Sequence, residues 1–326
     1  MIYGFQKHLS ANYPSQIIID VTQYCNLACI HCPHSEFVKS KAFTGACLDV
    51  NLNKKLVNEI AEDKTGTCQY LRYCASGETL LHPGIDNIIS YAGKHSNLKI
   101  NITTNGILLI EKKANTLLDA GVNVFDISLD AFRNETYQKI RGKDLLKKVK
   151  QNILNLIKLI KKGNYNTKIV LSFIEQPLNS NEKKDFKNYW EEAGADFVVI
   201  RRLHSAGGAK TGIKKTMEET YKGINRKPCL YPWERLVLTP IGTVGFCPAD
   251  WKHESQICSF KENSIMEIWQ GNFMNNLRKA HLNNEFSKFA FCGQCPDWIH
   301  TRWPGEGRAY ADMMIELTLD KLMNNK

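Results

Sequence analysis

Three cysteines with a short, regular spacing are the residues of this chain most plainly suited to chemistry. Cys25, Cys29 and Cys32 form CxxxCxxC within residues 20–33, directly after an apolar run at 17–19. A zinc site normally uses four ligands, whereas three thiolates can hold a cubane iron-sulfur cluster and leave one iron open. The spacing therefore favours a metal site over a chance cluster of buried thiols.

Four further cysteines form a second set in the last third of the chain. Cys229 is followed by twelve residues, Gly242, four residues and Cys247, and Cys292 and Cys295 then form CxxC. Four thiols can enclose structural zinc or a fully ligated iron-sulfur cluster, and the spacing leaves both open. Free cysteines are commonly buried. We therefore interpret the remaining four as buried or incidental free thiols: Cys47, Cys68, Cys74 and Cys258.

Composition indicates a globular protein of the reducing interior of the cell. Apolar residues make up 43% of the 326 residues and charged residues 23%, which is ordinary for a folded domain. No apolar run is long enough to span a bilayer or to form the core of a signal peptide. Eleven cysteines in such a chain predict metal binding rather than disulfides, and we expect a cytoplasmic location.

The net charge of +10 suits an anionic substrate, cofactor or acidic carrier, and would also suit nucleic acid. The lysines, however, are dispersed over helix surfaces, as in residues 147–162, and are not massed with aromatic residues. This pattern is typical of solvated helix faces and argues against a nucleic-acid partner.

Alternating strand and helix signals must position these residues. Strands are expected at about 16–22, 70–76, 97–105, 123–131, 167–175 and 195–202, with helices between them. Six such repeats imply an α/β fold with a parallel sheet, either doubly wound or curled into a partial (β/α)6 TIM-like barrel. We favour the barrel over residues 1–203 because polar residues follow the strands, where barrel chemistry gathers.

The rest of the chain has a different character. Residues 204–228 are rich in glycine and lysine and predict a linker or flap. A β-hairpin at 233–246 and one amphipathic helix at 265–281 are expected within a small domain over 229–326. A unit of this size can form only a small hydrophobic core, and a bound metal would therefore stabilise it.

The order of the motifs resembles that of radical S-adenosylmethionine (SAM) enzymes with a C-terminal SPASM or twitch domain, over nearly the whole chain. CxxxCxxC is followed by SGE at 76–78, TNG at 104–106, SLD at 128–130 and the glycine-anchored second cysteine set. The resemblance implies that the first set holds a [4Fe-4S] cluster whose open iron binds SAM. It also implies that Cys229, Cys247, Cys292 and Cys295 supply all four ligands of an auxiliary [4Fe-4S] cluster.

The resemblance also assigns SAM contacts. His31 stands where the family has an aromatic residue beside the adenine, and Ser76, Gly77 and Glu78 match the family's GGE element. In this element Glu78 would face the methionyl ammonium as a carboxylate. Ser128, Asp130 and Arg141 match positions near the ribose and the methionyl carboxylate, whereas Thr104 and Asn105 either contact the cofactor or cap their strand.

No cysteine follows Cys295, so the resemblance is to family members with a single auxiliary cluster, such as the aminocyclitol dehydrogenase that oxidises 2-deoxy-scyllo-inosamine. It implies an oxidoreductase of carbohydrate biosynthesis whose 5'-deoxyadenosyl radical attacks a small-molecule substrate. A secondary alcohol of a sugar, aminocyclitol or nucleotide-linked sugar would become a ketone. A flavodoxin or ferredoxin would supply electrons. A further group must accept or orient the hydroxyl proton. The candidates are Glu175, Arg201, Arg202 and Asp250. A salt bridge or a SAM contact would also explain each of them.

Three alternatives stay open. One is a peptide- or protein-modifying maturase, and another is a sugar epimerase in which Cys74 or Cys258 donates hydrogen. The third is a zinc-stapled binding protein without catalysis, against which the intact first cysteine set and Glu78 argue.

Overall fold

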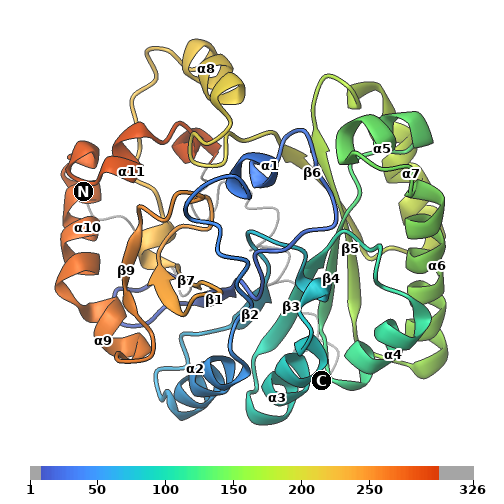
Figure 1. The fold of residues 1–326 in the computed structure, drawn as a ribbon, viewed down its shortest axis with the longest axis horizontal. Helices are drawn as coiled ribbons and strands as arrows, with labels where there is room; N and C mark the ends of the chain where they lie inside the picture. Colours follow the sequence, from blue (N-terminus) through green and yellow to red (C-terminus); the bar gives the residue numbers. More distant parts are fainter. Residues whose placement is uncertain (1–8, 301–326) are drawn as a thin grey trace, which may run out of the picture.

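Nine strands form one sheet in residues 9–300, the part of the chain that the computed structural model describes (Figure 1). The order is β6-β5-β4-β3-β2-β1-β7-β8-β9, parallel from β6 to β7 and antiparallel from β7 to β9. In chain order the strands are β1 Gln16–Ile19, β2 Tyr70–Tyr73, β3 Lys99–Thr104, β4 Val124–Ser128, β5 Lys168–Glu175, β6 Phe197–Arg202, β7 Arg235–Leu238, β8 Thr243–Gly245 and β9 Gln256–Ser259.

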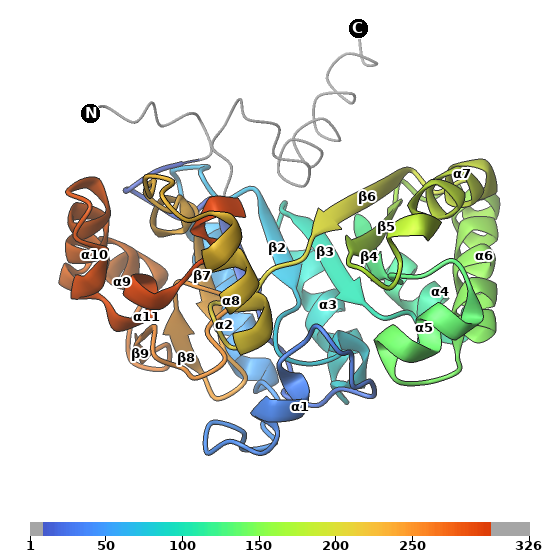
Figure 2. The same cartoon turned by 90° about the horizontal axis from the view of Figure 1, so that it is seen from above.

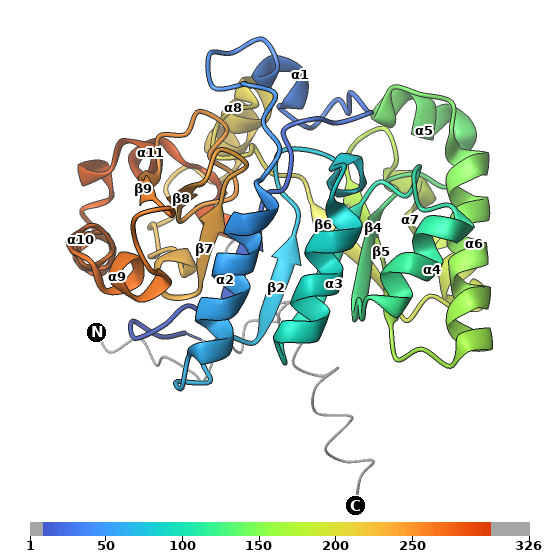
Figure 3. The same cartoon turned by 60° about the horizontal axis from the view of Figure 1, so that its bottom comes forward.

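Helices connect the parallel strands and cover the outer face of the sheet. Figure 3 shows α2, α3, α4 and α6 side by side along it, and Figure 2 shows the C-terminal elements at one end of the curved sheet and α5 to α7 at the other. These helices are α1 His34–Phe37, α2 Val50–Glu62, α3 Ile85–His95, α4 Glu111–Asp119, α5 Asn134–Arg141, α6 Leu146–Gly163 and α7 Lys183–Ala193. The predicted partial TIM-like barrel is thus confirmed.

Shorter elements complete the chain beyond the barrel. The helices there are α8 Thr211–Thr220, α9 Ile265–Gln270, α10 Asn272–Leu282 and α11 Ala290–Gln294. Single 3₁₀ turns lie at η1 Thr79–Leu81, η2 Ser180–Glu182, η3 Tyr231–Trp233, η4 Phe286–Lys288 and η5 Asp297–His300. Within residues 9–300, every helix falls short of the length and apolar character that a bilayer crossing requires.

Side-chain alternation along the strands separates an apolar outer face from an inner face that combines apolar and polar residues. The odd-numbered positions of β1, such as Ile17, and the even-numbered positions of β3, such as Ile100, belong to the core under the helices. On the inner face Asp126 is almost fully buried and forms ion pairs with Arg72 at 3.4 Å and Arg201 at 2.9 Å. The same face carries a small apolar cluster formed by Tyr70, Val124, Val170 and Val199.

The structure corrects one prediction about the last third and adds detail to two others. The segment 204–228, predicted as a linker or flap, contains α8. The helix expected at 265–281 is two helices, since Gly271 adopts an extended conformation that ends α9 and begins α10. The hairpin expected at 233–246 is formed by β7 and β8, and β7 also pairs with β1, so that the hairpin extends the barrel sheet. Residues 1–8 and 301–326 of the predicted domains lie outside the described residues.

Candidate functional site

The cysteine loop, residues 20–33, follows β1 and is held by the end of β2. Glu78 donates its backbone N–H to the Tyr24 carbonyl at 2.8 Å. Gly77 lies so close that an added Cβ would stand 2.1 Å from the Thr22 carbonyl oxygen. Glycine is thus required at this position for a steric reason, and the SGE motif fixes the path of the loop.

The first cysteine set meets the requirements of a cluster site. Its three thiols are free, and Arg141 donates from Nη1 to the Cys29 sulfur at 3.5 Å. Burial raises the pKa of Cys25 to about 11 and that of Cys32 to about 12, so metal must displace protons when it binds. The buried guanidinium is placed to compensate the negative charge that three thiolates would bring.

Glu78 is the centre of a hydrogen-bonded network beside this loop. The carboxylate is 3% exposed and accepts from the Leu80 N–H at 3.1 Å, the Thr104 hydroxyl at 2.5 Å and the Asn105 N–H at 2.8 Å. A carboxylate offers about four acceptor positions, so capacity remains for an ammonium. Thr104 and Asn105, whose role the sequence left open, are thus placed to hold Glu78.

A second buried acid lies next to Cys29. Asp130 is fully buried with a left-handed φ of 60° and forms an ion pair with Arg141 at 2.7 Å. His31 Nε2 lies 3.5 Å from the same carboxylate, and burial lowers the pKa of His31 to about 4. Three residues predicted from the resemblance are therefore brought together at the first cysteine set. Ser128, a fourth, lies half-buried at the end of β4.

The second cysteine set also converges in space. Burial, together with the neighbouring thiols, raises the pKa of Cys247 well above its ordinary value, and burial raises that of Cys295 to about 12. Arg226 interacts with Cys229, Cys292 and Cys295, so a cation again faces the thiols. Four free thiols from three separate segments therefore suit a closed cluster site.

In the described part of the chain, no three His, Cys, Asp or Glu side chains are arranged around a single metal ion. A cubane cluster differs from one ion because each thiolate binds a different iron, so that its ligands need not converge on one point. The free thiols and the adjacent guanidinium groups fit such clusters at both sets.

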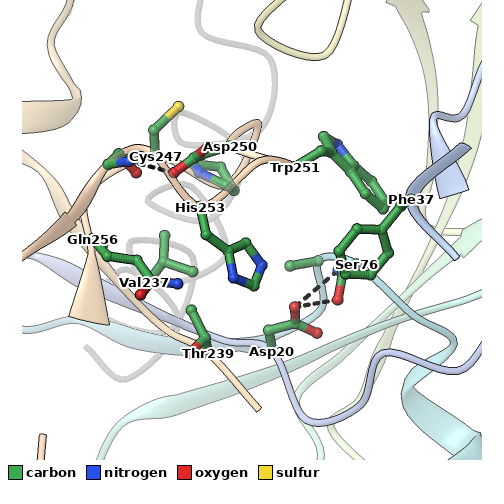
Figure 4. A pocket seen from close by; sticks show the side chains of 14 residues that line it. Asp20, Phe37, Ser76, Val237, Thr239, Cys247, Asp250, Trp251, His253 and Gln256 are labelled. Atoms are coloured by element: carbon green, nitrogen blue, oxygen red, sulfur yellow. Dashed lines mark hydrogen bonds between the residues drawn. The ribbon is translucent and has the colours of Figure 1, made fainter. Parts of the chain in front are cut away.

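A hollow lies between the ends of β1 and β2 and the segment that begins at Cys247 of the second set (Figure 4). Asp20 and Ser76 form one wall, at the ends of β1 and β2. Asp250, Trp251 and His253, which follow Cys247, form the opposite wall. The hollow is open to solvent and has a volume of about 420 Å³ including its open mouth.

Of the four candidate proton acceptors, only Asp250 lines the hollow. Glu175 pairs with Lys183 at 2.7 Å on the surface. Arg201 is engaged by Asp126 inside the barrel, and Arg202 is exposed. Glu175 and Arg201 therefore form salt bridges, which was the alternative explanation for their presence in the sequence.

Among the titratable residues that line the hollow, sequence reasoning missed Asp20 and His253. Asp20 accepts hydrogen bonds from the Ser76 hydroxyl and, at 3.2 Å, from the Ser76 N–H. The available signal was its place at the end of the first strand, five residues before Cys25. For His253 the signal was only its closeness to Cys247 along the chain.

Comparison with known proteins finds one family model for the N-terminal part of the chain and another for the C-terminal part. The Radical SAM superfamily model matches residues 19–174, and the model described as an iron-sulfur cluster-binding domain, SPASM, matches residues 229–296. A GTP 3',8-cyclase of Clostridium acetobutylicum is 31% identical over 195 residues, which are 59% of this chain and 57% of the cyclase. The chain spans about 57% of the length of the first curated relatives it matches.

Solved structures share the fold. BtrN in complex with AdoMet and 2-DOIA has a TM-score of 0.57 at 20% identity, over 86% of this chain and 92% of BtrN. SuiB of Streptococcus suis, bound to the precursor peptide SuiA, has a TM-score of 0.64 at 12% identity, over 82% of this chain and 67% of SuiB. The SPASM match decides between zinc and iron-sulfur at the second set. This chain therefore carries a radical SAM domain followed by a SPASM domain, and its cofactors are SAM and two [4Fe-4S] clusters.

Proposed function

We propose that this chain is a radical SAM dehydrogenase that oxidises a secondary alcohol of a sugar or aminocyclitol to a ketone. When bound, the cofactors supply a 5'-deoxyadenosyl radical at the first cysteine set and a one-electron acceptor at the second. The chain's own residues must hold the substrate between them, exclude water and take up the hydroxyl proton.

The observation that carries this proposal is the chemistry of the hollow. Its lining residues contribute two carboxylates, Asp20 and Asp250, and one imidazole, His253, but no lysine or arginine. Phe37 and Trp251 add an aromatic wall, with ring centroids 5.3 Å apart. Carboxylates accept hydrogen bonds from hydroxyl or ammonium groups, and aromatic rings cover the C–H faces of a saturated ring. A neutral or amine-bearing polyol fits this lining.

The fold of BtrN, whose solved complex contains 2-DOIA, supports an aminocyclitol in particular, because the likeness extends over 92% of that chain. The predicted flavodoxin or ferredoxin donor and the cytoplasmic location stay predictions.

A second candidate, GTP cyclisation, is favoured by the sequence identity of 26–31% to the cyclases. That identity covers 56–60% of this chain. A triphosphate carries several negative charges and would meet two carboxylates and no cation in the hollow.

A substrate panel separates the two candidates. The reconstituted holoenzyme is given reductant, SAM and, separately, C-deuterated myo-inositol, 2-deoxy-scyllo-inosamine, glucosamine or GTP. We expect deuterium in 5'-deoxyadenosine and a ketone product with an inositol-type or amino-sugar probe. Turnover of GTP alone would refute the dehydrogenase and support the cyclase.

A further inference from the structure

The proposed oxidation needs a base at one defined place. The hydrogen atom of the carbinol C–H bond passes to the 5'-deoxyadenosyl carbon, and one electron passes to the iron-sulfur acceptor at the second cysteine set. The hydroxyl proton must then pass to a protein group as the C=O bond forms. This inference rests on the proposed function, and it concerns which residue takes that proton.

Asp20 is the best-placed acceptor. It follows β1, is 6% exposed and lines the hollow. Ser76 donates to its Oδ2 through both the hydroxyl and the backbone N–H, which fixes the plane of the carboxylate. Within residues 9–300, no Lys, Arg or His lies within ion-pair distance of it. A buried carboxylate without a paired cation keeps its affinity for a proton.

The opposite wall contains a group that lacks a partner. Asp250 accepts from the Ser255 N–H through Oδ2, whereas its Oδ1 is buried without a hydrogen bond. A buried acceptor of this kind is costly unless a ligand satisfies it. In Figure 4 the ring of His253 projects from the same segment into the hollow, on the side of Asp20.

Backbone strain marks both walls. Ala75 has a φ of 146° and His253 a φ of 60°, and neither residue is glycine. Both line the hollow, one from each domain. Non-glycine residues in such conformations cluster at functional sites, because the surrounding structure must hold them there.

We propose that Asp20, oriented by Ser76, accepts the hydroxyl proton of the substrate, and that Asp250 binds a neighbouring hydroxyl or ammonium group. Asp20 is then a catalytic residue and Ser76 a positioning residue. The assignment replaces the earlier choice among four candidates, of which Asp250 keeps a binding role.

The acidity of Asp20 suits this role. Burial raises its pKa to about 7, against the opposing effect of the Ser76 hydrogen bonds, and a general base works best near the operating pH. The titratable groups that face it are Cys74, which follows β2, and Cys247, Asp250 and His253 from the opposite wall. Burial lowers the pKa of His253, so that this ring stays neutral when Asp20 ionises.

The decisive variant is Asp20→Asn in the reconstituted holoenzyme, with SAM and the deuterated polyol that the wild type turns over. We expect deuterium transfer into 5'-deoxyadenosine to stay within about threefold of the wild type while ketone formation falls by about 100-fold or more, the usual size of a general-base effect. Asp86→Asn, at a partly exposed ion pair with Lys113, is the matched control and should leave both unchanged.

Ser76→Ala tests the positioning role. Loss of a hydrogen bond to the charged form raises the pKa of Asp20. The ratio of ketone to 5'-deoxyadenosine, which should rise with pH through about 7 in the wild type, must therefore rise at higher pH in this variant. An unchanged pH profile would overturn the role of Ser76.

A readout without turnover is the carboxyl infrared band of the substrate-free holoenzyme. The wild type should lose a protonated-carboxyl band as pH rises through about 7, and Asp20→Asn should lack it. Ketone formation at the wild-type rate by Asp20→Asn would overturn the proposal for Asp20. Loss of the wild-type carboxyl band near pH 4 instead of near pH 7 would overturn it as well. Uncoupling by Asp250→Asn alone would transfer the role to Asp250. A wild type that makes no ketone from any polyol would instead refute the proposed function itself.

Discussion

At the residue scale, the buried ion pair between Asp130 and Arg141 lies beside the first cysteine set. Asp130 is fully buried, and its charge is compensated by Arg141, which also contacts Cys29. The sequence predicted both residues from the motif resemblance, but as separate SAM contacts. Their pairing could not be predicted, because it depends on how α5 packs back onto the cysteine loop.

Arg141→Met should lower the free energy of unfolding by about 3–5 kcal/mol, because it leaves the Asp130 carboxylate buried without its cation. Urea unfolding of the metal-free, reduced chain measures this loss. Lys113→Met breaks an ion pair whose partners are 25% and 40% exposed and should cost less than about 1 kcal/mol. Equal losses in the two variants would contradict the importance of the buried pair.

The raised pKa of Asp20 predicts a pH-dependent stability. Burial raises this pKa from 3.8 to about 7, so the folded state holds the proton more tightly than the unfolded state. The associated stability is fully present below pH 3.8 and is lost as pH rises through about 7. At pH 8 the ionised group then costs on the order of 4 kcal/mol.

Asp20→Asn should therefore stabilise the chain more at pH 8 than at pH 5. Unfolding midpoints of both proteins across this range provide the measurement, with Asp86→Asn as the control. A difference between variant and wild type that does not change with pH would show that Asp20 titrates normally.

At the element scale, the sequence predicted the parallel strands to within a few residues, since each is a short apolar run followed by polar residues. It missed α8 because this helix buries only Met217, so its apolar periodicity is too weak to see. It also missed the break at Gly271, since the apolar spacing continues from Ile268 and Trp269 in α9 to Leu277 in α10.

The end of β2 and the cysteine loop behave as one unit, and Gly77 is the test of this. Gly77→Ala would place a Cβ 2.1 Å from the Thr22 carbonyl oxygen and 2.5 Å from that of Tyr24, so the loop must shift. We expect iron at the first site to fall at least about twofold and SAM binding to weaken by about tenfold or more, since cofactor positioning tolerates little displacement.

Gly212→Ala is the matched control for this substitution. It lies in the first turn of α8 with nothing within 4 Å of the added Cβ, so that alanine meets no clash there. Iron content and equilibrium dialysis with SAM should therefore be unchanged. Normal SAM binding by Gly77→Ala would show that the loop is not fixed by this contact.

At the scale of the whole molecule, β7 is the connection that brings the segment after Cys247 to the end of β1, which precedes the first cysteine set. Because β7 pairs with β1, the segment after Cys247 faces the end of β1. The sequence predicted each set of ligands but not the hollow beside Cys247, because no local pattern encodes pairing between strands more than two hundred residues apart. Asp20 went unrecognised for the same reason.

The two clusters should be separable. Cys247→Ala removes one auxiliary ligand and should lower the iron content from about eight to about four per chain, the content of one cubane cluster. Formation of 5'-deoxyadenosine should continue while ketone formation stops. Iron analysis and product quantification after anaerobic reconstitution give the answer, and a variant that still makes ketone would exclude the auxiliary cluster as electron acceptor.

The stoichiometry of turnover tests the central claim most directly. The holoenzyme, with a polyol or aminocyclitol that it turns over, should form one ketone for each 5'-deoxyadenosine, and the deuterium of the carbinol carbon should appear in the latter. A substrate that transfers deuterium but returns as an epimer, or a radical that reacts only with GTP or a peptide, would contradict the account.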